Sequence, residues 1–140
     1  MVFKINVSHK GKTAKFETEN EELIDKAICE KLSGSDVSPD LEGYELEITG
    51  TSDKAGFPGL KQFPGPGLKK ALLSYGIGMH TKPMGLSKKP VASPPGLILR
   101  KTVSGNAISA DTVQINIKVT KEGSKMFEEI LPKKESAPAQ

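Results

Sequence analysis

Several residue types are scarce or missing in this sequence, and each scarcity excludes a class of protein. The 140 residues include one cysteine and no tryptophan, and aromatic residues make up 5%. One cysteine excludes an internal disulfide framework and a zinc site built on several cysteines. No apolar run approaches the roughly 18 residues of a membrane helix, and the first residues lack the apolar segment of a secretion signal. We therefore expect a cytoplasmic chain with no membrane partner and with a core of Ile, Leu and Val.

Groups suited to catalysis or metal binding are also scarce. His9 and His80 are the only histidines, and neither lies at ligand spacing from a cysteine or from the other histidine. Cys29 falls on the apolar side of a predicted helix, where a small buried hydrophobe is the expected role. No serine lies in a nucleophile-elbow pattern, and the glycine-rich stretches match no phosphate-binding loop. We expect no enzyme, no metal, no cofactor and no small-molecule substrate.

Acidic residues are nearly absent from residues 50–105. That segment has nine cations against one acid, Asp53, and a net charge of +8, whereas the first fifty residues carry −5 and the residues from 106 onward are neutral. Such charge separation is typical of a surface that binds a polyanion, most commonly nucleic acid, although a solvated surface is the alternative interpretation. The candidate RNA-binding residues are Lys54, Lys61, Lys69, Lys70, His80, Lys82, Lys88, Lys89, Arg100 and Lys101.

Alternation of apolar and polar residues predicts five or six short strands. They cover residues 2–7 and 12–17, which form a hairpin, and residues 44–48, 68–75, 97–103 and 112–120. Residues 18–33 change to helical spacing, with a capping box at Thr18 and Glu21, and residues 124–131 fit a short second helix. We expect a mainly β fold: a small antiparallel β-barrel with one α-helix and long basic loops rich in proline and glycine.

Length and composition predict one domain over residues 1–131, including the basic segment, and a disordered tail over residues 132–140. Within the domain, residues 53–67 and 76–96 are too rich in proline and glycine for regular structure. Lysines on such loops would neutralise phosphates, and glycines would let the backbone approach them. Phe57, Phe63 and Tyr75 could stack on bases, but they form no regular platform. Backbone contact with folded RNA is therefore favoured over readout of a single strand.

Two blocks of sequence resemble those of a known family. Residues 48–58 are similar to the Ile-x-Gly-Gly-x-Asp-Lys-x-Gly-Phe-Pro block of the e-type family of archaeal and eukaryotic small-subunit ribosomal protein six. Residues 100–109, continuing to 113–119, resemble the Arg-Lys-x-Val-Arg-Gly strand pair of the same family, in the same order and spacing. Thr51 stands where the family has glycine, and Ser104 where it commonly has arginine. The long basic helix that ends the eukaryotic members is missing, as in an archaeal-type short form.

The resemblance implies a non-catalytic β-barrel on the cytoplasmic small ribosomal subunit, in contact with ribosomal RNA and neighbouring ribosomal proteins. Asp53, Lys54, Gly56, Phe57 and Pro58 would form the signature loop, with Phe57 as a barrel anchor or an RNA contact. One alternative is a free-standing RNA- or protein-binding module, in which the acidic residues 17–30 meet a basic protein. Another is a small enzyme that uses His80 beside an acid.

Overall fold

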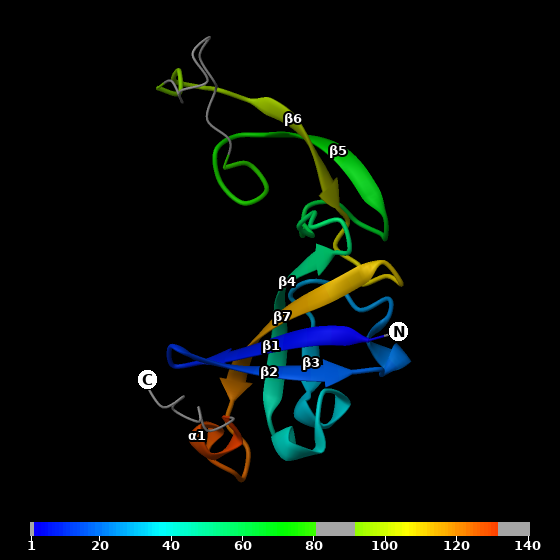
Figure 1. Ribbon diagram of the computed structural model, residues 1–140, viewed down its shortest axis with the longest axis vertical. Coiled ribbons are helices and arrows are strands. Elements are labelled where there is room, and N and C mark those ends of the chain that lie inside the picture. Colours follow the sequence, from blue (N-terminus) through cyan, green and yellow to red (C-terminus); the bar gives the residue numbers. More distant parts are fainter. Residues whose placement is uncertain (1, 81–91, 132–140) are drawn as a thin grey trace, which may run out of the picture.

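The computed structural model describes residues 2–80 and 92–131, and it divides their strands into two sheets (Figure 1). The first sheet has the order β2-β1-β7-β4-β3, and the second pairs β5 with β6. The strands are β1 (Phe3–His9), β2 (Lys12–Thr18), β3 (Lys31–Ser33), β4 (Glu45–Asp53), β5 (Leu68–Leu73), β6 (Leu99–Ser104) and β7 (Thr112–Lys121). Three single-turn 3-10 helices, η1 (Glu21–Leu23), η2 (Gly34–Asp36) and η3 (Pro39–Leu41), and one α-helix, α1 (Phe127–Ile130), complete the elements.

The predicted strands are confirmed. The hairpin of residues 2–7 and 12–17 is β1 and β2, and the remaining predictions correspond to β4, β5, β6 and β7. β4 is longer than expected, because it continues past Gly50 to Asp53 through register shifts against β7. The expected tail over residues 132–140 lies outside the described residues.

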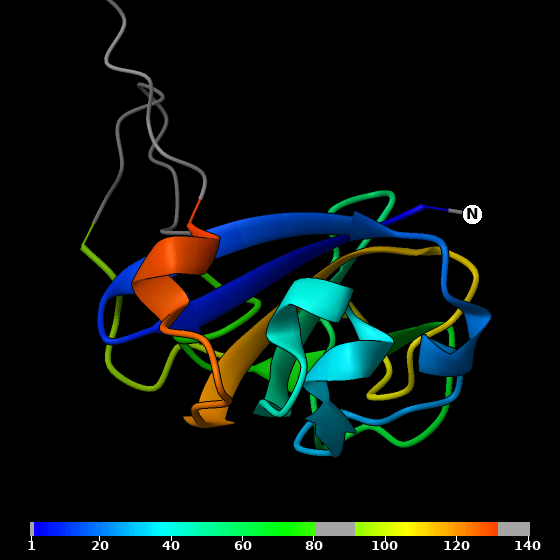
Figure 2. The same cartoon turned by 90° about the horizontal axis from the view of Figure 1, so that it is seen from below.

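The core forms on one face of the five-stranded sheet. In register, Ile5 lies beside Phe16 of β2 and Ile115 of β7, while Ile48 of β4 lies beside Ile117. Residues 20–44 and the loop before β7 cover this face with apolar side chains, and α1 closes it beside the β1–β2 turn (Figure 2). The opposite face carries polar side chains, since alternate residues of a strand point to opposite faces.

The predicted antiparallel β-barrel is wrong: the sheets are open. β1 pairs with β7 in parallel, which places the first and last long strands in the centre and leaves β2 and β3 as the edges. A closed barrel would require the edge strands β2 and β3 to pair with each other, and they do not. β5 and β6 do not bridge them, because as strands they pair only with each other and extend from one end of the molecule (Figure 1). We call this hairpin, β5 with β6, the arm.

The helix predicted over residues 18–33 is also wrong. Its apolar residues are buried, as Leu23 and Ile28 show, but the chain there forms the single-turn helix η1, two further turns and β3. Backbone N–H groups bond to distant segments instead of to the previous turn: Cys29 donates to the Ile48 carbonyl at 2.8 Å. Cys29 is exposed and has φ +74°, which a helix excludes. Tertiary hydrogen bonds have overridden a helical pattern too short to be stable alone.

The end of the molecule opposite the arm is tied together by ion pairs between the β1–β2 turn and the chain after β7. Lys10 Nζ lies 2.6 Å from Glu122 Oε1, His9 Nε2 lies 2.5 Å from the same oxygen, and Lys12 Nζ lies 2.5 Å from Glu128 Oε1. The His9 ring also packs edge-on against Phe127, with centroids 5.5 Å apart. These contacts dock α1, the short helix predicted near residues 124–131.

Acid is expected to weaken this docking. The hydrogen bonds from Lys10 and His9 and the positive charge of Lys10 lower the pKa of the Glu122 carboxyl below its ordinary value of 4.5. A lowered carboxyl pKa stabilises the fold above the ordinary value, and this contribution is lost as the pH falls through and below 4.5. Glu122→Gln should therefore lower Tm near neutral pH, and the difference from wild type should vanish in acid.

Thermal melts followed by circular dichroism across the acidic range measure this difference. Glu42→Gln is the matched control, since Glu42 is exposed and forms no ion pair within the described part of the chain. A Tm difference for Glu122→Gln that persisted unchanged in strong acid would contradict the assignment.

Candidate nucleic-acid interface

The outer face of the arm carries two of the predicted cations. In the register of β5 and β6, Lys70 lies opposite Thr102 and Leu72 opposite Arg100. Directly opposed residues of an antiparallel pair share a face. Lys70 and Arg100 are exposed, and Leu72 between them is 73% exposed. This face presents two positive charges and an apolar side chain to solvent.

The other two arm cations lie on the inner face. Lys69 is opposite Val103, and Lys101 is opposite Ala71, and both of these apolar partners are buried. The Lys69 ammonium donates a hydrogen bond to the Pro64 carbonyl, so it joins the arm to the loop before it. The four cations that the sequence groups together are thus divided between two faces, with only Lys70 and Arg100 on the outer one.

The signature loop is a tight turn at the end of β4. The Asp53 N–H donates to the Phe57 carbonyl at 3.0 Å, and the Gly56 N–H donates to the Asp53 carbonyl at 2.8 Å. Gly56 has φ +87°, which glycine adopts without strain. Lys54 Nζ lies 2.5 Å from Asp111 Oδ1, and this hydrogen bond raises the Lys54 pKa. Phe57 is half-buried. Lys54 thus joins the turn to the start of β7.

The residues after the signature loop attach the arm to the sheet. The Ser104 N–H donates to the Pro58 carbonyl at 2.9 Å, and the Leu60 N–H donates to the Ser104 carbonyl at 3.2 Å. On the other side, the Gly59 N–H donates to the Thr51 carbonyl of β4 at 2.9 Å. The loop therefore lies between β4 and β6 and bonds to both.

A second set of bonds orders the rest of this loop. The Gly105 N–H donates to the Gly67 carbonyl at 2.9 Å, and the Asn106 N–H donates to the Phe63 carbonyl at 2.8 Å. The Asn106 side-chain oxygen accepts from the Gly65 N–H at 3.1 Å. Of residues 53–67, expected to be irregular from their proline and glycine content, Asp53 ends β4 and the rest contain no named helix or strand. They are nevertheless held in place by the chain at residues 104–106.

The charges at the two ends of the molecule differ in their pairing. Residues 54–80 and 92–110 contain no Asp or Glu. Within the described ranges, Lys61, Lys69, Lys70 and Arg100 form no ion pair with a carboxylate, whereas four lysines at the α1 end do. Those four are Lys10, Lys12, Lys121 and Lys125. The arm end therefore carries uncompensated positive charge.

His80 is exposed, and its ring lies edge-on to Tyr75 with centroids 5.6 Å apart. The predicted RNA-binding residues Lys82, Lys88 and Lys89 lie outside the described residues. Among residues 2–80 and 92–131, no group of three or more His, Cys, Asp or Glu side chains could hold a metal ion. None of the helices found there is long and apolar enough to cross a membrane.

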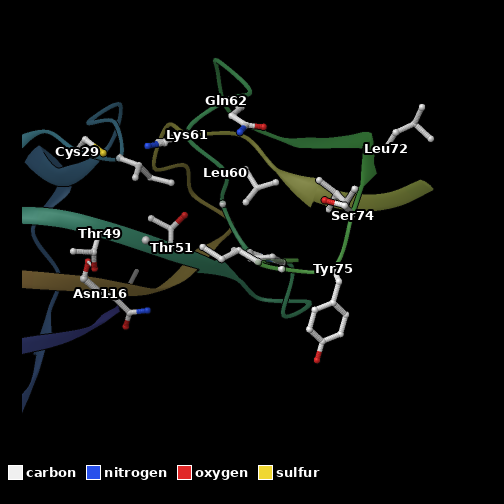
Figure 3. A pocket seen from close by; sticks show the side chains of 17 residues that line it. Cys29, Thr49, Thr51, Leu60, Lys61, Gln62, Leu72, Ser74, Tyr75 and Asn116 are labelled. Carbon is white, nitrogen blue, oxygen red and sulfur yellow. Dashed lines mark hydrogen bonds between the residues drawn. The ribbon is translucent and has the colours of Figure 1, made fainter. Parts of the chain in front are cut away.

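Sequence reasoning missed a cavity between the five-stranded sheet and the arm. It encloses about 660 Å³ (Figure 3). The sheet contributes Thr49, Thr51 and Asn116, and the arm and the loop after it contribute Leu73 and Tyr75. Alternation along β7 predicts that Asn116 points away from the core. It does not predict that residues 72–75 lie near Asn116, because the two segments are far apart in the sequence.

Comparison with known proteins agrees with the resemblance in the two sequence blocks. The family model described as ribosomal protein S6e matches residues 1–132. A small ribosomal subunit protein eS6 from Methanococcus maripaludis is 42% identical over 126 residues, covering 89% of this chain and 91% of the relative. The protein of that name from Methanobrevibacter smithii is 39% identical over 132 residues, 94% of this chain and 93% of the relative. A protein of the same name from Archaeoglobus fulgidus is 42% identical over 115 residues, covering 81% of this chain and 78% of the relative.

Proposed function

We propose that this chain, which belongs to the ribosomal protein S6e family, is a structural constituent of the small ribosomal subunit and binds ribosomal RNA through the arm and the loops beside it. The family is one of ribosomal structural proteins, so the chain is not an enzyme, as the sequence predicted. The relatives named above are archaeal, in agreement with the archaeal-type form. The proposed location is the cytoplasmic ribosome.

The observation that carries the RNA contact is the unpaired charge of the arm. Lys70 and Arg100 project from the outer face, and Lys61 lies on the loop beside it, with no acid in residues 54–80 or 92–110. Phosphates bound there would release counterions, which gives strong binding that weakens with salt. Such contacts position a protein on RNA without reading its sequence.

Sedimentation of the tagged chain in a cell lysate over a range of salt concentrations tests the proposal. We expect the chain to run with the small subunit at low salt and to leave it only at high salt, because the contact is largely electrostatic. A chain that stayed at the top of the gradient even at low salt would contradict both the ribosomal role and the RNA contact. A free-standing module would then be the better interpretation.

A further inference from the structure

The cavity between the sheet and the arm has one apolar wall. Tyr75 and Ile77 of the loop after β5 line it, and they are 63% and 74% exposed. Large apolar side chains exposed together mark a surface that is covered in a complex. The volume, about 660 Å³, falls within the range of roughly 300–1,000 Å³ that is typical of sites for small, largely enclosed ligand groups.

The facing wall is polar and supplies hydrogen-bonding groups. The Asn116 side-chain oxygen accepts from Asn6 Nδ2 at 3.2 Å and from Gln114 Nε2 at 2.9 Å. Its NH2 group forms no hydrogen bond with the described residues and remains a donor. Gln62, across the cavity on the loop side, adds a second amide (Figure 3). Amide side chains pair with the donor and acceptor edges of bases.

Positive charge lies at the cavity and beyond it. Lys61 lines the cavity, is exposed and forms no ion pair within the described ranges. From Asn116 a row of side chains crosses the outer face of the sheet to Asn6 and then Lys15, which lie beside one another in register. Lys15 is exposed and likewise has no carboxylate partner there. A polyanionic strand crossing the cavity would meet a cation on each side.

We propose that this cavity receives an unpaired nucleobase, turned out of the bound RNA, with a neighbouring phosphate at Lys61. A base has two apolar faces and a polar edge. The apolar wall of the cavity, with its aromatic ring, would contact a face of the base, and the amides and hydroxyls of the polar wall would bind its edge. The inference rests on the proposed RNA contact and adds to it a site for one exposed base. An apolar protein segment would leave the amides of Gln62 and Asn116 without partners, which favours the base.

Cross-linking of the full chain to small-subunit ribosomal RNA transcribed with 4-thiouridine tests the inference. After irradiation, mass spectrometry should locate base cross-links at Tyr75 or Gln62. Removing an aromatic stacking partner costs about tenfold in affinity per base. Tyr75→Ala should weaken binding by up to about tenfold without changing its dependence on salt, because it removes no charge.

Leu68→Ala is the matched control. Leu68, on the outer face of β5 with Lys70, is also a large apolar side chain and is 53% exposed, but it does not line the cavity. The affinity of Leu68→Ala for RNA should equal that of wild type.

Cross-links confined to the outer face of the arm, with Tyr75→Ala binding RNA normally, would contradict the base site while leaving the RNA contact intact. Cross-links from the cavity to another protein in intact subunits would overturn it too. If the wild-type chain failed to bind RNA at all, that result would instead contradict the proposed function.

Discussion

Replacing Lys61, Lys69, Lys70 and Arg100 together with glutamine is expected to lower the affinity for small-subunit ribosomal RNA by about a hundredfold or more at low salt. Each phosphate contact contributes a slope of about −0.7 to −0.9 to the dependence of log K on log salt. Losing up to four contacts should therefore flatten that slope by about 3. Filter binding at several salt concentrations measures both quantities. Glutamine is polar and uncharged and has a shorter side chain than lysine or arginine, so it removes the charge without adding bulk and the fold should be retained.

A second quadruple variant separates a local contact from net charge. Lys10, Lys12, Lys121 and Lys125 lie at the α1 end and pair with carboxylates, so changing them to glutamine removes the same formal charge elsewhere. This variant should bind RNA within a few-fold of wild type and keep the slope. Equal losses in the two variants would mean that total charge, and not the arm, determines binding.

Gly105→Ala is expected to destabilise the junction of arm and sheet by about 3 kcal/mol or more, as a side chain forced into a packed site does. A Cβ on Gly105 would lie 1.8 Å from the Gly65 carbonyl oxygen and 2.9 Å from the Gly65 carbonyl carbon. Both are backbone atoms, so the loop must move. That movement would strain the hydrogen bond from Gly105 to Gly67 and the neighbouring ones from residue 106.

Urea unfolding measures this loss, and Gly50→Ala is its control. A Cβ on Gly50, in β4, would meet nothing within 4 Å, and its φ is not in the left-handed range. The stability of Gly50→Ala should stay within about 1 kcal/mol of wild type. Because residues 104–106 hold the arm, Gly105→Ala should also reduce RNA affinity. A Gly105→Ala protein as stable as wild type would show that the loop yields easily and that the junction is not rigid.

The residue types of the RNA-contact candidates could be identified from the sequence, but their arrangement could not. Composition alone picks out a segment with nine cations and one acid. The register of β5 against β6 then divides the arm cations, with Lys70 and Arg100 on one face and Lys69 and Lys101 on the other. Lys54 belongs to neither face, since it is held by Asp111. Partners of this kind lie far along the chain, so no local pattern reveals them.

The sequence by itself determined most of the buried apolar side chains and six of the seven strands. Alternation in residues 2–7 and 112–120, and the apolar residues between 18 and 33, depend on local chemistry: an apolar side chain leaves water whatever structure contains it. The blocks at residues 48–58 and 100–109 also indicated the family, which the comparisons confirmed.

Only the tertiary structure decided which partner each segment takes. β1 pairs in parallel with β7 across more than a hundred residues, and the sheet is open where a barrel was expected because its edge strands β2 and β3 do not pair. Residues 18–33 have helical spacing, but hydrogen bonds to β4 and to residues 106–108 hold them in turns and a short strand. The cavity beside Tyr75 and Asn116 arises in the same way. Backbone hydrogen bonds between distant segments are worth as much as local ones, and the pairing that also buries the core prevails.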